Sequence, residues 1–186
     1  MINSVITISR QYGSGGRFVA RKLAEKLGIP FYDNEIITMA AKESGYAENL
    51  FEKAEQVSTH SLLYSLSMFG TAAGLPLSDK VFLIQSDIIK ECAAKGPCII
   101  VGRCSDYVLK EQSNLINFFL YSDLDSRVKR VQKYYDNDAK DIREDIERRD
   151  KKRATYYNYY TTQRWGATEN YHLSIHTDAV GNDGCV

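Results

Sequence analysis

The chain has 186 residues, of which 44% are apolar, and this length is typical of one compact domain with a substantial core. Its 24 basic and 24 acidic side chains cancel, so the net charge gives no support to nucleic-acid or polyanion binding. The four cysteines form neither a CxxC pair nor a zinc-type cluster, no leader pattern opens the sequence, and no apolar run approaches the roughly 18 residues of a membrane span. We therefore expect a soluble, cytoplasmic protein without a membrane partner.

The first expected elements are a strand and a helix separated by a glycine-rich loop. Residues 4–9 (SVITIS) are largely β-branched and predict a short strand, while apolar side chains at every fourth position predict a helix after the glycines. Residues 30–33 suggest a second strand, and Asp33 or Asn34 would cap a helix that runs to about Gly45. The chain thus begins in the order strand, loop, helix, strand, helix.

The middle and the end of the chain continue this alternation. Residues 47–95 are mostly helical in pattern, while 98–101 and 115–121 predict buried strands, each followed by a helix. The helix after the second of these strands opens with Ser122-x-x-Asp125, a capping-box pattern. Residues 171–175 predict the last strand, and no closing helix is expected after it. Strands that alternate with helices indicate a parallel α/β sheet.

The glycine-rich loop, residues 12–17 (YGSGGR), admits three interpretations. It is a tight turn whose glycines adopt positive φ angles, a dinucleotide-binding fingerprint, or a phosphate-binding loop at the start of a helix. The fingerprint would use Gly13, Gly15 and a ribose-binding Asp33, but the bulky Phe18 stands where its third glycine should permit close packing. Backbone N–H groups at the start of a helix favour the phosphate-binding interpretation.

The loop departs from the standard P-loop pattern GxxxxGK[ST], although Gly15 fits its final glycine. In that register Arg10 replaces the first glycine, Gly16 the lysine, and Arg17 the hydroxyl residue that binds Mg²⁺. Arg17 or Arg10 would therefore have to supply the missing positive charge. The residues expected to hold the donor phosphates are Arg10, Gly13, Ser14, Gly15, Gly16 and Arg17.

Three segments carry a resemblance to a known family. The run SRQYGSGGR, followed by LAEKLG and FYD, resembles the cytidylate kinase-like family, a branch of the nucleoside monophosphate kinases that has GSGGR in place of the Walker lysine motif. Residues 102–106 (GRCSD) resemble the GRDxGT segment of bacterial cytidylate kinases, and residues 149–156 (RDKKRATY) resemble their RDxxDxxR lid segment. The resemblance extends along nearly the whole chain.

This resemblance implies an α/β P-loop kinase fold with three layers and a five-stranded parallel sheet, as a single domain over residues 1–186. It places a helical acceptor-binding insertion at about residues 34–95 and a short lid at about residues 136–165. The implied reaction is the ATP-dependent phosphorylation of a nucleoside monophosphate, CMP or dCMP, with Mg²⁺ bridging the donor phosphates. The expected partners are small-molecule nucleotides.

The roles implied by the resemblance belong to matching positions. Arg103 matches the arginine that holds the acceptor monophosphate. The expected catalytic residues are Arg17, Arg103, Arg149 and Arg153, and the expected substrate-binding residues are Asp33, Arg103, Asp106, Asp150 and Tyr156. Cys104, Arg153 and Tyr156 depart from the family pattern. A kinase for a different small acceptor and a nucleotide-binding module without catalysis therefore remain alternatives.

Each of these residues also has a simpler interpretation. Arg149 and Arg153 are four apart and share a helix face, which would also be an ordinary solvated face paired with neighbouring acids. Arg103 follows a buried strand, where it binds a ligand or forms a structural salt bridge. Asp33 contacts the acceptor or caps the next helix, and Asp106 has the same ambiguity.

Other patterns argue against nucleic-acid and metal binding. Tyrosines interleave with basic residues near position 156, as in proteins that stack on single strands, but Tyr156 and Tyr160 share a helix face that is expected to pack the lid against the body. His172 and His176 have a zinc spacing only on a helix, whereas a strand is expected there, so no metal site is predicted.

Arg127 and Arg130 belong to the helix expected after the fourth strand. They are expected at the surface, on a helix that could also border the donor site.

Overall fold

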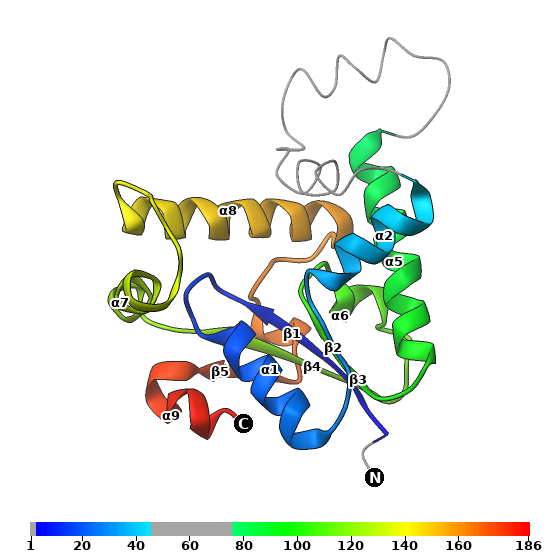
Figure 1. Cartoon of the computed structure of the whole chain (residues 1–186), viewed down its shortest axis with the longest axis horizontal. Coiled ribbons are helices and arrows are strands. Elements are labelled where there is room, and N and C mark those ends of the chain that lie inside the picture. The colour runs from blue at the N-terminus through cyan, green and yellow to red at the C-terminus, as the bar shows by residue number, and fades with distance from the viewer. Residues whose placement is uncertain (1–2, 46–75) are drawn as a thin grey trace.

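The computed structural model describes residues 3–45 and 76–186 of the chain. Its centre is a parallel sheet of five strands in the order β2-β3-β1-β4-β5. The strands are β1 (Val5–Arg10), β2 (Phe31–Tyr32), β3 (Cys98–Val101), β4 (Leu115–Tyr121) and β5 (Leu173–His176). Helices cover both sides of the sheet, as Figure 1 shows, so the expected α/β fold is confirmed.

The helices connect the strands and, at one end of the sheet, lie across it. They are α1 (Gly16–Leu27), α2 (Glu35–Ser44), α5 (Leu77–Ala94), α6 (Ser105–Val108), α7 (Leu124–Tyr134), α8 (Ile142–Thr161) and α9 (Thr177–Gly184), with one 3₁₀ turn, η1 (Thr168–Asn170). The long helix α8 lies above the end of the sheet at which the chain leaves β1 and enters α1 (Figure 1).

Alternate residues of the central strands face opposite layers of the molecule. Ile6, Ile8 and Ile99 belong to one buried cluster with the apolar side of α1. Their neighbours Val5 and Ile100 belong to a second cluster with α2 and α5. Both faces are apolar because successive side chains of a strand point to opposite sides and this sheet is covered on both. The uniform β-branched runs in the sequence are explained by this two-sided burial.

The sheet order places β1 between β3 and β4. The chain builds one half of the sheet through β2 and β3 and then crosses to build the other half through β4 and β5. In such sheets ligands bind outside the carboxyl ends of the strands, near the point where the order reverses. The loops that follow β1, β2 and β3 therefore meet where a site is expected.

The strand boundaries predicted from the sequence agree with the structure to within about two residues. The expected insertion at residues 34–95 is described only at its two ends, where α2 and α5 pack against each other. Its part from 46 to 75 lies outside the described residues.

The capping box predicted at Ser122 and Asp125 is wrong. Helix α7 begins after Asp123, and no side chain caps it. The Ser122 hydroxyl instead donates a hydrogen bond to the Asp178 carboxylate at 2.7 Å. The pattern failed because a carboxylate far along the chain competes successfully for the serine hydroxyl.

The absence of a closing helix was also a wrong expectation, since α9 follows β5 directly. The Thr177 hydroxyl donates to the backbone oxygen of Ser14 at 2.8 Å, which ties the start of α9 to the glycine loop. Figure 1 shows α9 beside α1. The helix is short and contains Gly181 with a φ angle of 70°, so it lacks the apolar periodicity by which a helix is recognised in a sequence.

None of the helices within residues 3–45 and 76–186 combines the length and the apolar character that a bilayer crossing requires.

Candidate active site

The glycine loop connects β1 to α1 through a turn that demands glycine. Gly13 and Gly15 have φ angles of 77° and 86°, in the left-handed region. A Cβ atom on Gly16 would lie only 2.7 Å from the Cβ atom of Arg10, and one on Gly15 would collide with the side chain of Asn182. The first backbone N–H groups of α1 have no intrahelical partner. This end of α1 can therefore receive an anion.

The sheet order excludes the dinucleotide interpretation. A dinucleotide-binding fold places its second strand beside the first, whereas β3 lies beside β1 here. Phe18 was expected to obstruct packing between helix and strand, but its side chain is exposed. The interpretation therefore fails because of the sheet order and not because of a steric conflict at Phe18.

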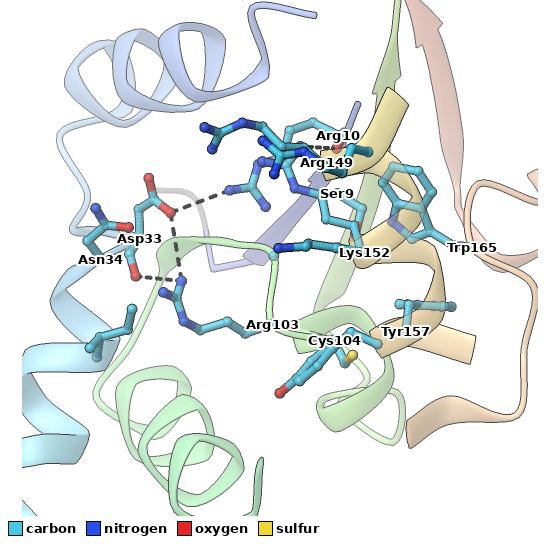
Figure 2. Close-up of a pocket in the computed structure, with 15 residues that line it drawn as sticks. Ser9, Arg10, Asp33, Asn34, Arg103, Cys104, Arg149, Lys152, Tyr157 and Trp165 are labelled. Atoms are coloured by element: carbon cyan, nitrogen blue, oxygen red, sulfur yellow. Dashed lines mark hydrogen bonds and ion pairs between the residues drawn. The ribbon is translucent and has the colours of Figure 1, made fainter. Parts of the chain in front are cut away.

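Asp33 is the centre of the charged groups at the site. It follows β2, its side chain is 3% exposed, and its carboxylate lies 2.6 Å from Nε of Arg17 and 3.6 Å from Nη2 of Arg10. Nη1 of Arg103 lies 3.8 Å from the same carboxylate and donates to the backbone oxygen of Asp33 at 2.9 Å. Neither Asp33 nor Asn34 caps α2 through its side chain. Arginines from β1, α1 and the loop after β3 thus converge on one buried carboxylate. Figure 2 shows two of them, Arg10 and Arg103, beside Asp33.

Arg103 is presented by an unusual turn. Gly102, Arg103 and Cys104 have consecutive φ angles of 76°, 55° and 55°, although the left-handed conformation is unfavourable for residues with a Cβ atom. A Cβ atom on Gly102 would overlap the guanidinium of Arg10, so only glycine lets these two groups approach. Strained conformations that persist in this way are concentrated at functional sites. The strain here fixes the direction of the Arg103 side chain.

A cavity of about 530 Å³ opens beside these arginines. Six basic side chains and one carboxylate, that of Asp33, line it, together with aromatic and small residues. The basic residues are Arg10, Arg103, Arg148, Arg149, Lys152 and Arg153, and the other lining residues are Ser9, Asn34, Ile37, Gly102, Cys104, Tyr156, Tyr157 and Trp165. The excess of positive charge matches a ligand with more than one negative charge. Figure 2 shows Asp33 and Trp165 on opposite sides of this space.

Helix α8 supplies four of the basic side chains and packs firmly on α5. The ring of Tyr160 stacks on that of Phe82 with 4.1 Å between centroids, and Tyr156 lies 4.8 Å from Tyr160. The tyrosines therefore pack the helix against the body, as expected. Arg148 and Arg149 both pair with Asp145 one turn earlier, so part of their charge is balanced within the helix.

Burial alone would raise the pKa of the Asp145 carboxyl. Hydrogen bonds from Arg149, Arg148 and Asn137 outweigh that effect and lower the pKa to about 2. Asp145 is therefore ionised throughout the physiological pH range.

Several expected site residues lie outside the lining of the cavity. Asp106 is buried and accepts a hydrogen bond from the Tyr157 hydroxyl at 2.7 Å. Burial raises the pKa of Asp106. Its contact supports Tyr157, which does line the cavity. Asp150 faces the glycine loop instead, where it pairs with Arg127. The loop residues Gly13, Ser14, Gly15, Gly16 and Arg17 adjoin the cavity without belonging to its lining.

The expectation that Arg127 and Arg130 lie at the surface is wrong. The side chain of Arg127 is 9% exposed and that of Arg130 is 17% exposed. Arg130 donates to the backbone oxygen of Gly13 at 2.5 Å and pairs with Asp178 at 3.1 Å. Both arginines therefore brace the glycine loop from the side of α7, which agrees with the alternative that this helix borders the donor site.

Sequence reasoning missed Lys152, Tyr157 and Trp165 as lining residues. Lys152 and Tyr157 lie in the segment that resembles a lid or next to it, and their helical spacing from Arg149 and Arg153 could have indicated them. Trp165 follows α8 and meets Phe119 edge to face with 5.3 Å between centroids. No local pattern marks it, because its position depends on the fold of the turn after the helix.

The residues of the site are better suited to binding the phosphates of ATP than to binding Mg²⁺ directly. The glycine turn and the N-terminus of α1 form a cradle that a Cβ atom would fill. At the position where P-loop proteins place a metal-binding hydroxyl stands Arg17, and the carboxylate it contacts, Asp33, is engaged by arginines. The hydroxyl that usually binds the metal is therefore missing from its P-loop position, and the carboxylate of Asp33 is shared with arginines.

Comparisons with known proteins agree with this geometry. A family model described as the cytidylate kinase-like family matches residues 5–179. A solved structure of an uncharacterized protein from Eubacterium ventriosum ATCC 27560 is 28% identical, with a TM-score of 0.67 over 97% of this chain and 94% of that one. A shikimate kinase from Bacteroides thetaiotaomicron is 15% identical, with a TM-score of 0.55 over 94% and 87% of the two chains, which shows a shared fold. No curated protein matches this chain. The fold is that of the P-loop kinases.

Proposed function

Because the chain belongs to the cytidylate kinase-like family, we propose that it transfers the γ-phosphoryl group of ATP to a nucleoside monophosphate, with CMP or dCMP as the acceptor. The observation that carries this proposal is the convergence of Arg10, Arg17 and Arg103 on Asp33, between the glycine loop and the cationic cavity. Phosphoryl transfer requires mainly that two polyanions be aligned and their charge neutralised. An arginine cluster between an anion cradle and a cationic cavity serves that need.

On the donor side, ATP supplies the transferred phosphoryl group when bound. The first N–H groups of α1 would hold its phosphates, and Arg17 would take the part of the missing lysine. The side chain of Arg17 is 47% exposed although it contacts Asp33, so it can exchange this carboxylate for a phosphate oxygen without leaving a buried cavity behind. A guanidinium also offers several N–H donors in a plane, which suits phosphate.

On the acceptor side, Arg103 would clamp the monophosphate. Its side chain is 8% exposed and its direction is fixed by the contacts with Asp33, so little freedom is lost when an anion binds. An acceptor phosphate oxygen would bond to the γ-phosphorus as the bond from that phosphorus to the bridging oxygen of ADP breaks. This oxygen is already ionised at neutral pH, so the protein need not remove a proton from it. Arg149 and Arg153 of α8 would neutralise the charge of the transferring group.

The test is an ADP-release assay with ATP, Mg²⁺ and each of CMP, dCMP, UMP, AMP and GMP. Wild-type protein is expected to turn over fastest with CMP or dCMP. Arg17→Ala should reduce kcat by about 100-fold or more, because a donor to the transferring phosphate is lost. Arg143→Ala is the matched control, since Arg143 is exposed and pairs with Asp125 away from the cavity. Turnover that Arg17→Ala leaves unchanged would remove Arg17 from the site.

A different small acceptor, one with a hydroxyl nucleophile, is the second candidate. Asp33 favours it, because a buried carboxylate that lines the cavity can accept a hydrogen bond from an attacking hydroxyl. Transfer to a polyol or hydroxy acid, without turnover on any nucleotide, would support this candidate. Tight ATP binding with no turnover on either acceptor class would support the third alternative, a nucleotide-binding module without catalysis.

A further inference from the structure

Tyr12 directly precedes the first glycine of the loop, and side chains hold both of its backbone polar groups. Its N–H donates to Oδ1 of Asp150 at 2.7 Å, and its carbonyl oxygen accepts from Nη1 of Arg127 at 3.3 Å. Arg127 and Asp150 also pair with each other at 2.5 Å, and their side chains are only 9% and 14% exposed. The backbone of Tyr12 therefore cannot shift unless this buried ion pair shifts with it.

The ring of Tyr12 is held from the same direction. The guanidinium carbons of Arg149 and Arg153 lie 4.7 Å and 5.5 Å from its centroid, within the range of cation–π attraction. Tyr135 meets the ring edge to face at 5.3 Å. Arg149, Asp150 and Arg153 all belong to α8, so one helix contacts the backbone and the ring of a single loop residue.

The same two arginines also line the cavity. Arg153 donates to the backbone oxygen of Arg10 at 3.3 Å as well, at the end of β1 where the loop begins. An anion that changes the position of Arg149 or Arg153 must therefore change the surface on which the Tyr12 ring lies. In the opposite direction, a loop that rearranges around phosphate must move the side chains of α8.

We propose that Tyr12 is a positioning residue that couples the phosphate loop to α8, so that ATP at the loop orders the helix that carries the acceptor-side arginines. The proposal rests on the proposed function in one respect, that ATP binds at the loop. It is independent of the identity of the acceptor. The coupling runs through the aromatic face of Tyr12, because the ring is the part of the residue that contacts Arg149 and Arg153.

Two substitutions separate this role from a merely structural one. Tyr12→Leu removes the aromatic face and keeps the backbone hydrogen bonds, whereas Tyr12→Phe keeps the face and removes only the hydroxyl. The phenylalanine variant is therefore the matched control. Tyr12→Met fills a similar volume without an aromatic face and takes the place of the leucine variant if that protein does not fold.

The experiment first measures ATP affinity by calorimetry, with Mg²⁺ and without an acceptor. Hydrogen exchange of the α8 amides, residues 142–161, is then followed with and without saturating ATP. In wild-type protein and Tyr12→Phe, ATP should slow this exchange by about fivefold or more, the lower end of common coupling strengths. In Tyr12→Leu, saturating ATP should slow the exchange of the α8 amides by less than about twofold. The coupling would then be weaker than is common between linked sites.

The outcomes distinguish this proposal from the proposed function. If wild-type protein binds ATP but the exchange of α8 does not change, the coupling is refuted and the kinase proposal is unaffected. The coupling is equally refuted if Tyr12→Leu shows the same protection by ATP as wild-type protein. If wild-type protein binds no ATP, both proposals fail.

Discussion

Arg127 and Arg130 on α7 and Arg148 and Arg149 on α8 form two cationic pairs in different surroundings. The α7 pair is 9% and 17% exposed, and the two arginines contact different carboxylates and different carbonyl oxygens of the glycine loop. The α8 pair is 60% and 47% exposed, shares the single carboxylate of Asp145, and lines the cavity. The buried α7 guanidiniums spend donors on carbonyl oxygens of the loop, whereas the exposed α8 pair shares one carboxylate and keeps donors for a ligand. We infer that the α7 pair supports the loop and that the α8 pair is placed to bind a ligand.

If this division is correct, removing one member of an ion pair lowers the free energy of unfolding more when the remaining member is buried. Asp33→Ala should have the largest effect, a decrease of about 3 kcal/mol in the free energy of unfolding, because the buried Arg103 loses its carboxylate. Urea unfolding measures it. Asp125→Ala is the control, since Asp125 is 76% exposed and should cost less than about 0.5 kcal/mol. Equal losses in the two variants would contradict the division.

Arg127→Ala tests the supporting pair directly. It leaves Asp150 buried without its closest cation and frees the carbonyl of Tyr12, so we expect a decrease of about 2 kcal/mol in unfolding free energy. Arg148→Ala should cost less than about 0.5 kcal/mol, because Arg148 is exposed and Arg149 still pairs with Asp145. A variant of Arg148 that is as unstable as that of Arg127 would show that the α8 pair is structural too.

Asp145 adds a pH dependence to the binding pair. Its folded pKa of about 2 lies below its ordinary value of 3.8, so its stabilising effect is complete above about pH 4 and is lost as the pH falls toward 2. Because both arginines are solvated, we expect only about 1 kcal/mol at pH 7 between wild-type protein and Asp145→Asn. Unfolding curves at several pH values should show this difference disappear near pH 2. A difference that is constant with pH would mean that the arginines do not stabilise the ionised carboxylate.

The smallest predicted effect concerns the strained turn after β3. Arg103→Ala and Arg103→Gly remove the same charged group, but only alanine keeps a Cβ atom at a φ angle of 55°. The left-handed penalty for alanine exceeds the greater entropy that glycine loses on folding, so the glycine variant should be more stable by about 0.5–1 kcal/mol. Parallel thermal and urea unfolding of the two variants measures the difference. A more stable alanine variant would show that the turn relaxes when the arginine is absent.

The architecture could be predicted from the sequence because its elements carry strong local signals. The β-branched run at residues 98–101 and the apolar, aromatic-rich run at residues 115–121 match β3 and β4, and the glycine turn before α1 is recognisable from its composition. Arg103 could be placed near a site because it follows a buried strand at the carboxyl end of a parallel sheet. The inferences about the strands and the turn succeeded because they depend on neighbours in the sequence, and Arg103 does line the cavity.

The surroundings of individual charges could not be predicted in the same way. Arg127 looks like a residue of a solvated helix face, and only the arrival of Asp150 from α8, 23 residues later, makes it a brace of the loop. The cluster around Asp33 depends on four segments that meet only in the folded sheet. Helix α9 is held by contacts such as the hydrogen bond from Thr177 to the glycine loop. Such contacts produce no periodic pattern of apolar residues in the sequence.

Trp165 is the only tryptophan of the chain, and it lies in the wall of the cavity across from Asp33. Its indole ring meets the ring of Phe119 edge to face and lines the same cavity as the cationic groups of α8. The intrinsic fluorescence of the protein therefore comes from one indole at the site, with tyrosine emission separable by excitation wavelength. A ligand that enters the cavity displaces water and charge next to this ring, so binding can be followed through its emission without a label and before any acceptor has been identified.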